Sequence, residues 1–399
     1  MEPAARWERK TNGRVGPAFD ILESEIDPKV VLPPLSSNKG SVVKPPRSGV
    51  NRRDLLRLRR PGAETARPAS TAGSGVGDSG LPDLIRVHRP GMGSYFEIRL
   101  GSTTPGAVEL ATRALDLVDR LEAQLTVYSE DSEVSRLNRT AHLGPVAVEP
   151  GLFGLLEQAT ELSRSTGGAY DVTSGALSEA WGFVRGPKRV PSPEALAEAR
   201  SRTGWRHLRL DRGARAATFD VEGLRINLGS IGKGYAIDRA ADVIRGHWLP
   251  TSALVHGGQS SLFALGSPPG RFGGRWEIAL RNPFAPENPL GVLRLRNRAL
   301  GTSGAAFQRF EVDGRSYGHI LDPRLGVPAD GPASVTVLAP TSAEADALSS
   351  ALFLLGAEGA RALVARRPEI GVVIVEEGAA DRSCRVTTFG LNEDDFTAA

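Results

Sequence analysis

The pattern of hydrophobic and polar residues changes near residue 84 of the 399-residue chain. Before that point, apolar residues occur only in short clusters among Pro, Gly, Ser and Arg. So few apolar side chains cannot offset the conformational entropy lost when a chain becomes ordered. We therefore predict that residues 1–80 are a mostly disordered tail and that residues 81–399 form one folded domain.

Apolar spacing predicts the elements of the folded part. Residues 94–100 alternate like a half-buried strand, and residues 105–128 and 150–166 have the spacing of helices. Strand-like runs follow near residues 208, 218, 225–228, 254, 262, 277–280, 292–295 and 335–338, with helices at 232–245 and 342–355. Runs of strands with inserted helices favour an α+β fold with a largely antiparallel sheet and flanking helices.

The positive charge of the chain lies in its N-terminal part. Residues 1–80 hold 14 Lys/Arg and 9 Asp/Glu, which leaves 35 basic against 37 acidic residues in the remainder. A folded part without net positive charge argues against a nucleic-acid-binding protein. The single cysteine, Cys384, excludes an internal disulfide, and no apolar run is long enough to predict a transmembrane helix.

Residues 51–57, with the sequence NRRDLLR, have the look of a twin-arginine export motif. An export signal needs an apolar segment directly afterwards, and residues 58–62 are Leu-Arg-Arg-Pro-Gly. The motif is therefore interpreted as a basic, solvated segment, with a degenerate export signal as the alternative.

The first segment with candidate chemistry is residues 341–350. Thr341 and Glu344 have the spacing of a capping box at the start of a helix, which would place Asp346 and Ser350 on one face. A carboxylate and a hydroxyl form a plausible part of a Mg²⁺ site, since Mg²⁺ prefers oxygen ligands and keeps waters and phosphates as the others. The alternative is a polar stripe that faces solvent.

The second segment, residues 225–235, runs from a strand-like stretch through a Gly-rich turn into a helix. Exposed backbone N–H groups at such a turn suit a phosphate, and Lys233 adds a positive charge. The spacing of Gly229, Gly232 and Lys233 is not that of a Walker A loop. A turn that merely needs glycine is the alternative.

Two further segments combine turns with polar residues. In residues 317–326, His319 could transfer a proton or stabilise a leaving phosphate, or could be an ordinary core histidine. In residues 167–175, an acid and several hydroxyls could bind the polar edge of a ligand, or Asp171 or Thr173 could only cap the next helix.

The order of these motifs is more informative than any one of them. They occur together with Gly91–Tyr95, Thr126–Tyr128, Asp131–Asn138, Trp181–Phe183 and Gly257-Gly258. Over roughly residues 84–375 the chain thereby resembles the ApbE family of flavin transferases. The resemblance implies a T-fold-like α+β architecture with FAD in a cleft. It also implies an enzyme that moves FMN from FAD to a Ser or Thr of a flavoprotein and releases AMP.

The resemblance also implies roles for individual residues. FAD would be bound by Met92, Tyr128, Ala169, Tyr170, Asp171, Asn227, Lys233 and Ile320. Mg²⁺ would be held by Asp346, the Ser350 hydroxyl, and oxygens at Ser230 and Ala343. The catalytic candidates would be His319, as an acid/base or phosphate-contacting group, and Asp346.

The chain departs from the family pattern at three places. Gln259, Ser260 and Ser261 follow Gly257-Gly258 where an acid is usual, and Asn227 replaces a common Asp. Ser350 stands in place of the usual Thr, which keeps the hydroxyl. Because two acids are lost, an FAD diphosphatase that yields FMN and AMP and a non-catalytic flavin-binding protein remain as alternatives.

The expected partners are FAD and an acceptor flavoprotein subunit with a Ser/Thr flavinylation site, such as an NqrC/RnfG-like FMN-binding domain. Neither nucleic acid nor a transmembrane helix is expected. The missing apolar segment after residues 51–57 favours the cytoplasm, whereas the resemblance favours the cell envelope.

Overall fold

The computed structural model describes residues 5–7, 84–249, 252–258, 260–271, 273–304, 309–378 and 383–399. A nine-stranded sheet forms the centre, in the order β1-β18-β17-β16-β11-β8-β7-β3-β2, and every neighbouring pair in it is antiparallel. Its strands are β1 (Ala5–Trp7), β2 (Leu84–Gly91), β3 (Ser94–Gly101), β7 (Ala253–Gly257), β8 (Ser261–Leu265), β11 (Arg298–Gly304), β16 (Ser334–Ala339), β17 (Gly371–Glu377) and β18 (Cys384–Phe389).

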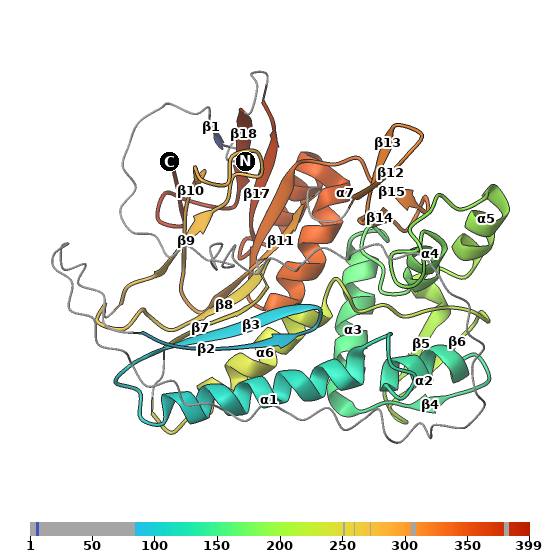
Figure 1. The fold of residues 1–399 in the computed structure, drawn as a ribbon, viewed down its shortest axis with the longest axis horizontal. Coiled ribbons are helices and arrows are strands. Elements are labelled where there is room, and N and C mark those ends of the chain that lie inside the picture. The colour runs from blue at the N-terminus through green and yellow to red at the C-terminus, as the bar shows by residue number, and fades with distance from the viewer. Residues whose placement is uncertain are drawn as a thin grey trace, which may run out of the picture. The chain divides into compact units, whose positions relative to one another are not determined.

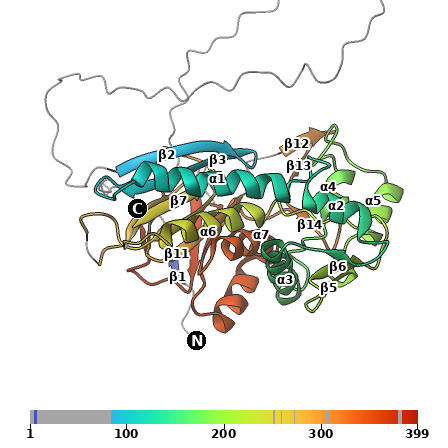
Figure 2. The ribbon, with the colours of Figure 1, turned by 90° about the horizontal axis from the view of Figure 1, so that it is seen from below.

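Three helices pack on one face of this sheet (Figures 1 and 2): α1 (Ala107–Leu125), α6 (Gly232–Arg245) and α7 (Ser342–Arg366). Alternate strand residues, such as Ile98, Val255 and Val337, join the buried faces of the helices in the main hydrophobic core. Alternate residues of each strand point to the same face, and the apolar residues of α1 recur at 3–4 spacing, so each element turns one apolar side toward the other.

The opposite face of the sheet is covered by a second, three-stranded sheet of β9 (Trp276–Leu280), β10 (Gly291–Leu295) and β19 (Phe396–Ala398). Leu254, Leu262 and Val373 from the main sheet meet Trp276 and Leu293 in a separate buried cluster. The central strands are therefore buried on both faces, which explains why several of them read as continuous apolar runs.

The remaining helices and short strands complete the fold (Figure 1). They are α2 (Glu133–Thr140), β4 (Val146–Ala147), α3 (Pro150–Ser165), α4 (Gly175–Ala180), α5 (Pro193–Ser201), a 3₁₀ turn at Trp205–His207, β5 (Leu208–Asp211), β6 (Ala216–Phe219), and the hairpins β12 (Arg309–Val312) with β13 (Arg315–Gly318) and β14 (Leu321–Asp322) with β15 (Val327–Pro328).

The predicted α+β class with an antiparallel sheet is confirmed, and the helix predicted at 232–245 is α6. The helix predicted at 342–355 is also present, but the helical segment continues to Arg366 across a break at Gly356, whose φ is 60°. The disorder predicted for residues 1–80 and the export-like motif at 51–57 lie outside the described residues, except for the strand Ala5–Trp7.

The strand predicted at residues 225–228 is wrong. The segment pairs with none of the strands that the structure describes, and an isolated bridge joins Arg225 to Ser174. Its backbone bonds go instead to the Asn138 side chain, which is bonded to both Ile226 N and Ile226 O, and to the Val172 carbonyl. The Asn138 side chain therefore satisfies the backbone N–H and C=O groups of Ile226, which a neighbouring strand would bond in a sheet.

Helix α7 is the one described helix that is long and apolar enough to span a membrane by length and composition. Its first half is buried, and it packs against α6, β11 and β16. A helix placed between a sheet and other helices needs this apolar composition for the core.

Candidate active site

The start of α7 is held in place by two caps. Thr341 Oγ1 accepts a hydrogen bond from Glu344 N at 3.3 Å, as the capping pattern predicts. The buried carboxylate of Asp238, on α6, accepts from Ser342 N at 2.7 Å and from Ala343 N at 2.9 Å. These bonds satisfy N–H groups that have no partner within the helix, so α6 fixes the first turn of α7.

Two glycines allow the neighbouring elements to approach this first turn closely. A Cβ atom on Gly234 of α6 would lie 2.2 Å from the Ser342 carbonyl oxygen. A Cβ atom on Gly301 of β11 would lie 2.5 Å from the Ala345 carbonyl carbon. Because real Cβ atoms do not approach so closely, only glycine fits at either position.

This close approach brings Asp346 against the beginning of α6. Gly234 N donates a hydrogen bond of 2.8 Å to Asp346 Oδ2, and the Ser261 hydroxyl donates to Asp346 Oδ1. Gly234 lies in the first turn of α6, which directly follows a turn formed by residues 227–231, hereafter the Ser230 turn. The structure therefore brings together the two segments from which the predicted Mg²⁺ ligands come.

A chain of hydroxyl groups connects Asp346 with Lys233. Lys233 Nζ donates to Ser260 Oγ at 2.7 Å, and the Ser260 and Ser261 hydroxyl oxygens are 3.2 Å apart. Ser261 completes the chain through its hydrogen bond to Asp346. These serines join an ammonium group to a carboxylate through neutral oxygens.

The electrostatics of Asp346 favour a cation. The side chain is buried, and burial raises the pKa of its carboxyl group, while the nearby positive charge of Lys233 and the hydrogen bonds from Ser261 and Gly234 lower that pKa. The carboxylate forms no direct ion pair with Lys233, which reaches Ser260 instead. A buried carboxylate without a direct countercharge gains from a bound cation.

The donor set fits Mg²⁺ better than metals that need several protein ligands. The described residues contain no group of three or more His, Cys, Asp or Glu side chains able to hold a metal ion. Asp346 would therefore be the only carboxylate, supported by neutral oxygens. Such a site suits Mg²⁺, which is commonly bound by one or two carboxylates and keeps waters and substrate phosphates.

Hydroxyl groups are plentiful beside Asp346 on α7. Ser350 Oγ lies 3.1 Å from Ser303 Oγ on β11 and 3.4 Å from the Asp346 carbonyl oxygen, and Ser349 Oγ lies 2.8 Å from Ser303 Oγ. Ser350 is therefore one turn from Asp346, as predicted, and Ala343 lies in the capped first turn. Their roles as metal ligands stay predictions.

Among the predicted FAD-binding residues, Tyr170 and Asn227 lie at this site together with Lys233. The Tyr170 side chain is buried next to Ser230, and the negative charge of Asp346 contributes to raising the pKa of its hydroxyl group. Asn227 shapes the Ser230 turn, since its Oδ1 accepts from Gly229 N at 2.9 Å. Asn227 N also donates to the Val172 carbonyl at 2.8 Å, which ties the Ser230 turn to the chain segment that carries Tyr170.

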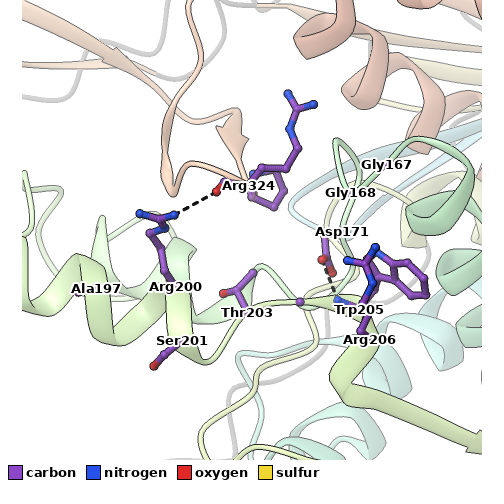
Figure 3. Close-up of a pocket in the computed structure, with 12 residues that line it drawn as sticks. Gly167, Gly168, Asp171, Ala197, Arg200, Ser201, Thr203, Trp205, Arg206 and Arg324 are labelled. Atoms are coloured by element: carbon purple, nitrogen blue, oxygen red, sulfur yellow. Dashed lines mark hydrogen bonds between the residues drawn. The ribbon is translucent and has the colours of Figure 1, made fainter.

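Asp171 has a structural role, and its predicted contact with FAD stays a prediction. Its carboxylate accepts hydrogen bonds from Thr173 N, Thr173 Oγ1 and Trp205 N at 2.7–2.9 Å. It also lines a surface pocket of about 520 Å³, whose lining includes Arg200, Arg206 and Arg324 (Figure 3). Burial raises the pKa of the Asp171 carboxyl group, and the bonds from Thr173 partly oppose this effect.

His319 and Ile320 lie between the two small hairpins, and both are half-buried. The hairpin before them places Phe310 and Tyr317 against Trp181, with ring centroids 6.4 and 5.5 Å from the Trp181 ring. Trp181 Nε1 donates to the Gly326 carbonyl at 2.8 Å, which connects the segment around Trp181 with the segment 317–326. These three aromatic side chains form a cluster, and Tyr317 in that cluster lies two residues before His319 in the chain.

Met92 and Tyr128 lie on other turns. Met92 occupies the β2–β3 turn with a φ of 49°, and its side chain packs against the main core. Tyr128 follows α1 and is 66% exposed. An exposed aromatic residue is available to a ligand, but the predicted contacts of Met92, Tyr128, His319 and Ile320 with FAD stay predictions.

Sequence reasoning missed four residues that shape the site: Gly234, Asp238, Ser261 and Gly301. Asp238 lies four residues after Gly234 on α6, so a buried acid on the inner face of an amphipathic helix was the available signal. Ser261 and Gly301 act through contacts between segments far apart in the chain, and local sequence carries no signal for them.

Comparison with known proteins agrees with this geometry. The sequence model of the ApbE family matches residues 92–374. The FAD:protein FMN transferase of Treponema pallidum is 32% identical over 75% of this chain and 88% of its own length. The protein of the same name from Salmonella typhimurium is 30% identical over 72% of this chain and 83% of its own length.

Solved structures give the same result. The crystal structure of the ApbE protein from Thermotoga maritima superposes with a TM-score of 0.69 at 30% identity, covering 75% of this chain and 96% of its own. The flavin transferase ApbE from Vibrio cholerae gives a TM-score of 0.68 at 27% identity, over 77% and 97% of the two chains. The chain is therefore an enzyme of the flavin transferase type and belongs to the ApbE family.

Proposed function

We propose that the protein transfers FMN from FAD to a Ser or Thr hydroxyl of a target flavoprotein, in a Mg²⁺-dependent reaction that releases AMP. The observation that carries this proposal is the contact between the Ser230 turn and α7, in which Gly234 N donates to Asp346 Oδ2. It places a buried carboxylate beside a Gly-rich turn at a helix N-terminus. Such a turn suits phosphate and such a carboxylate suits a cation.

The residues present would hold the Mg²⁺ ion through the Asp346 carboxylate, the Ser350 hydroxyl, and oxygens at Ser230 and Ala343. When bound, Mg²⁺ supplies charge neutralisation for the diphosphate. Lys233 would add a second positive charge at the same end of α6, where its ammonium group now contacts Ser260. Asn227 would keep the turn in the shape that exposes its N–H groups.

The transfer forms one bond and breaks one. The acceptor hydroxyl oxygen bonds to the phosphorus of the FMN half, the bond from that phosphorus to the AMP oxygen breaks, and the hydroxyl proton is lost. His319 is the candidate to take this proton or to contact the phosphate. Reactions of this kind depend mainly on positioning and on stabilising charge, so few protein groups need to react directly.

Two other functions remain, and both follow from the acids that the family pattern has and this chain lacks. With water in place of the acceptor hydroxyl, the protein would be an FAD diphosphatase that yields FMN and AMP. Without catalysis, it would be a flavin-binding protein. The hydroxyl groups of Ser260 and Ser261, which are bonded to Lys233 and to the catalytic candidate Asp346, support an organised catalytic site over simple binding.

Chromatography of the products tests all three functions. The protein is incubated with FAD and Mg²⁺, with and without an NqrC/RnfG-like FMN-binding domain. We expect AMP to appear only when the acceptor is present, in amounts equal to the FMN that the acceptor gains. Free FMN and AMP without the acceptor would show a diphosphatase, and intact FAD under both conditions would show a flavin-binding protein.

A further inference from the structure

The segment that follows α4 carries positive charge and no acidic residue. Residues 183–190, hereafter the basic loop, have the sequence FVRGPKRV. Arg185, Lys188 and Arg189 are all exposed, and none of them forms an ion pair with a residue that the structure describes. Exposed charges of one sign without countercharges create a positive potential, which attracts a negatively charged partner.

The basic loop is closed at its base, so its backbone has a defined course. Arg189 N donates a hydrogen bond of 3.2 Å to the Trp181 carbonyl, which joins the two ends of the loop. A Cβ atom on Gly182 would lie 2.2 Å from the Pro187 carbonyl oxygen, so only glycine allows the chain to turn back here. A loop that is already shaped in the free protein loses less entropy when it binds a partner.

One side of the basic loop lies against the segment that carries Tyr128. Arg185 Nη2 donates a hydrogen bond of 2.7 Å to the Val127 carbonyl. Tyr128, the next residue, is exposed and is one of the residues expected to bind FAD. The guanidinium group gains no countercharge from this bond, because a carbonyl oxygen carries no net charge. The basic loop therefore borders the predicted FAD site and keeps its positive charge.

The other side of the basic loop meets the β12–β13 hairpin through aromatic rings. The centroid of the Phe183 ring lies 5.7 Å from that of Phe310, and the Phe310 ring stacks on Tyr317 at 5.4 Å. All three side chains are half-buried, and Tyr317 precedes the catalytic candidate His319 by two residues. Half-buried aromatic rings beside exposed cations are typical of surfaces that bind other proteins.

The chemistry of the transfer requires a protein partner at this place. The acceptor hydroxyl must come within hydrogen-bond reach of the group that takes its proton, for which His319 is the candidate. The chain on either side of that hydroxyl then lies on the surface that borders His319. The β12–β13 hairpin is electrically balanced, with two Arg, one Glu and one Asp, so the net charge of this surface comes from the basic loop.

We propose that the basic loop and the β12–β13 hairpin bind the acceptor flavoprotein, through an acceptor segment with acidic side chains next to its Ser or Thr. The inference rests on the proposed function and deepens it, since it names the surface for the second substrate and the charge which that substrate carries. Opposite charges favour the encounter and fix its orientation, and a basic segment would be repelled by the same loop.

The test reverses the charge of the basic loop with the double variant Lys188→Glu/Arg189→Glu. The matched control is Arg113→Glu/Arg366→Glu, which reverses two exposed basic residues on α1 and α7, outside this surface. The acceptor is an NqrC/RnfG-like FMN-binding domain, used unaltered and with Lys in place of the acidic residues that flank its Ser or Thr. Transfer rates at low ionic strength give kcat/KM for each acceptor, and calorimetry gives the dissociation constant of FAD with Mg²⁺.

We expect the loop variant to lower kcat/KM for the unaltered acceptor about tenfold or more, with FAD affinity unchanged. The Lys-substituted acceptor should be a poor substrate for the unaltered protein and a better one for the loop variant, which a purely structural role of the loop would not produce. The control variant should match the unaltered protein in both measurements.

Four results would overturn the inference: an unchanged kcat/KM in the loop variant, an equal loss in the control variant, weaker FAD binding by the loop variant, or no gain with the Lys-substituted acceptor. Weaker FAD binding would assign the basic loop to the dinucleotide and not to the acceptor. If the unaltered protein transfers no FMN to the unaltered acceptor, the proposed function fails and the inference fails with it.

Discussion

At the residue scale, Asp346 has a different partner for each of its carboxylate oxygens. Gly234 N fixes one oxygen and the Ser261 hydroxyl the other, so the side chain is oriented before any ligand arrives. Each oxygen still has a lone pair to offer, because a carboxylate oxygen can accept two bonds. The residue therefore combines a fixed position with free coordination capacity.

Replacing Asp346 by Asn should lower the rate of AMP release by a factor of about 100 or more, since the proposed cation would lose the one carboxylate assigned to it. The amide keeps the size of the side chain and can still accept one hydrogen bond, so the fold should persist by circular dichroism. His319→Ala should reduce the rate less. Metal-dependent transfer that survives in Asp346→Asn would refute the role given to this carboxylate.

Replacing Ser261 by Ala should lower the free energy of unfolding by about 1–3 kcal/mol, because the buried carboxylate loses a hydrogen bond. Ser260→Ala is the matched control, since Ser260 contacts Lys233 and Ser261 but not Asp346. Urea unfolding of the two variants gives the comparison. Equal losses of unfolding free energy in the two variants would mean that the hydrogen bond from Ser261 to Asp346 contributes no more to stability than the contacts of Ser260.

At the element scale, the site depends on how closely α6 and β11 approach the first turn of α7. Gly234 and Gly301 remove the side chains that would separate these elements, and the Asp238 carboxylate holds the free N–H groups of that turn. Burial raises the pKa of Asp238 to about 6 against the lowering effect of the bonds from Ala343 and Ser342. The geometry of Asp346 is thus set by packing between elements.

Gly234→Ala should destabilise the protein by at least about 2 kcal/mol and reduce activity, since its Cβ atom would overlap the Ser342 carbonyl group. Gly154→Ala is the control. Gly154 is an exposed residue inside α3 with no atom within 4 Å of the added Cβ, so alanine there should stabilise the protein by about 0.5–1 kcal/mol. Thermal unfolding that ranks the two variants the other way would contradict the packing described.

The sequence predicted elements well where the pattern was local. Residues 232–245 combine an amphipathic spacing with a preceding Gly-rich turn, and the helix has those bounds. Residues 225–228 look like a strand, but their hydrogen-bond partner is the Asn138 side chain, 88 residues away. Strand β17 lies within a continuous apolar run beyond the long helix and was not assigned. Periodicity cannot identify a partner that only the folded chain supplies.

The residue types of the candidate site could be predicted from local motifs, but the contacts that organise the site could not. Asp346, Ser350, Ser230 and Lys233 stand in motifs whose residue types suggest a cation and a phosphate. The bonds that organise them come from Ser261, which is 85 residues from Asp346, and from Asp238, which is 104 residues from Ser342. Those contacts depend on the order of strands in the sheet, which the sequence pattern did not specify.

At the scale of the whole molecule, three layers hold the site in place. Helices cover one face of the nine-stranded sheet and the smaller sheet covers the other, so β7, β8 and β11 are packed on both faces where they approach α6 and α7 (Figures 1 and 2). Near the end of β7, the buried His256 ring contacts Glu97 of β3 at 3.1 Å, and Arg99 is bonded to the same carboxylate. This cluster joins two neighbouring strands of the main sheet.

Glu97 should make the stability of the domain depend on pH. Burial raises its pKa, but the hydrogen bonds from His256 and Arg99 outweigh that effect and lower the pKa to about 2. A carboxyl group with a lowered pKa stabilises the folded state above its ordinary pKa of 4.5, and that stabilisation is lost as pH falls from there toward 2.

In the Glu97→Gln variant this contribution is absent. We expect the unaltered protein to lose about 1–3 kcal/mol more than the variant between pH 6 and pH 3, measured by urea unfolding. Other carboxyl groups titrate equally in both proteins, so the difference isolates Glu97. Parallel curves for the two proteins would show that the cluster contributes nothing to acid stability.

The central claim is that the Ser230 turn and Asp346 form one site for FMN transfer. The most direct measurement is the intact mass of an NqrC/RnfG-like FMN-binding domain after incubation with the protein, FAD and Mg²⁺. Our account predicts a mass increase of one FMN less one water on a Ser or Thr, which is absent with Asp346→Asn or with a chelator. An unchanged acceptor mass with the unaltered protein, or an equal increase with Asp346→Asn, would contradict it.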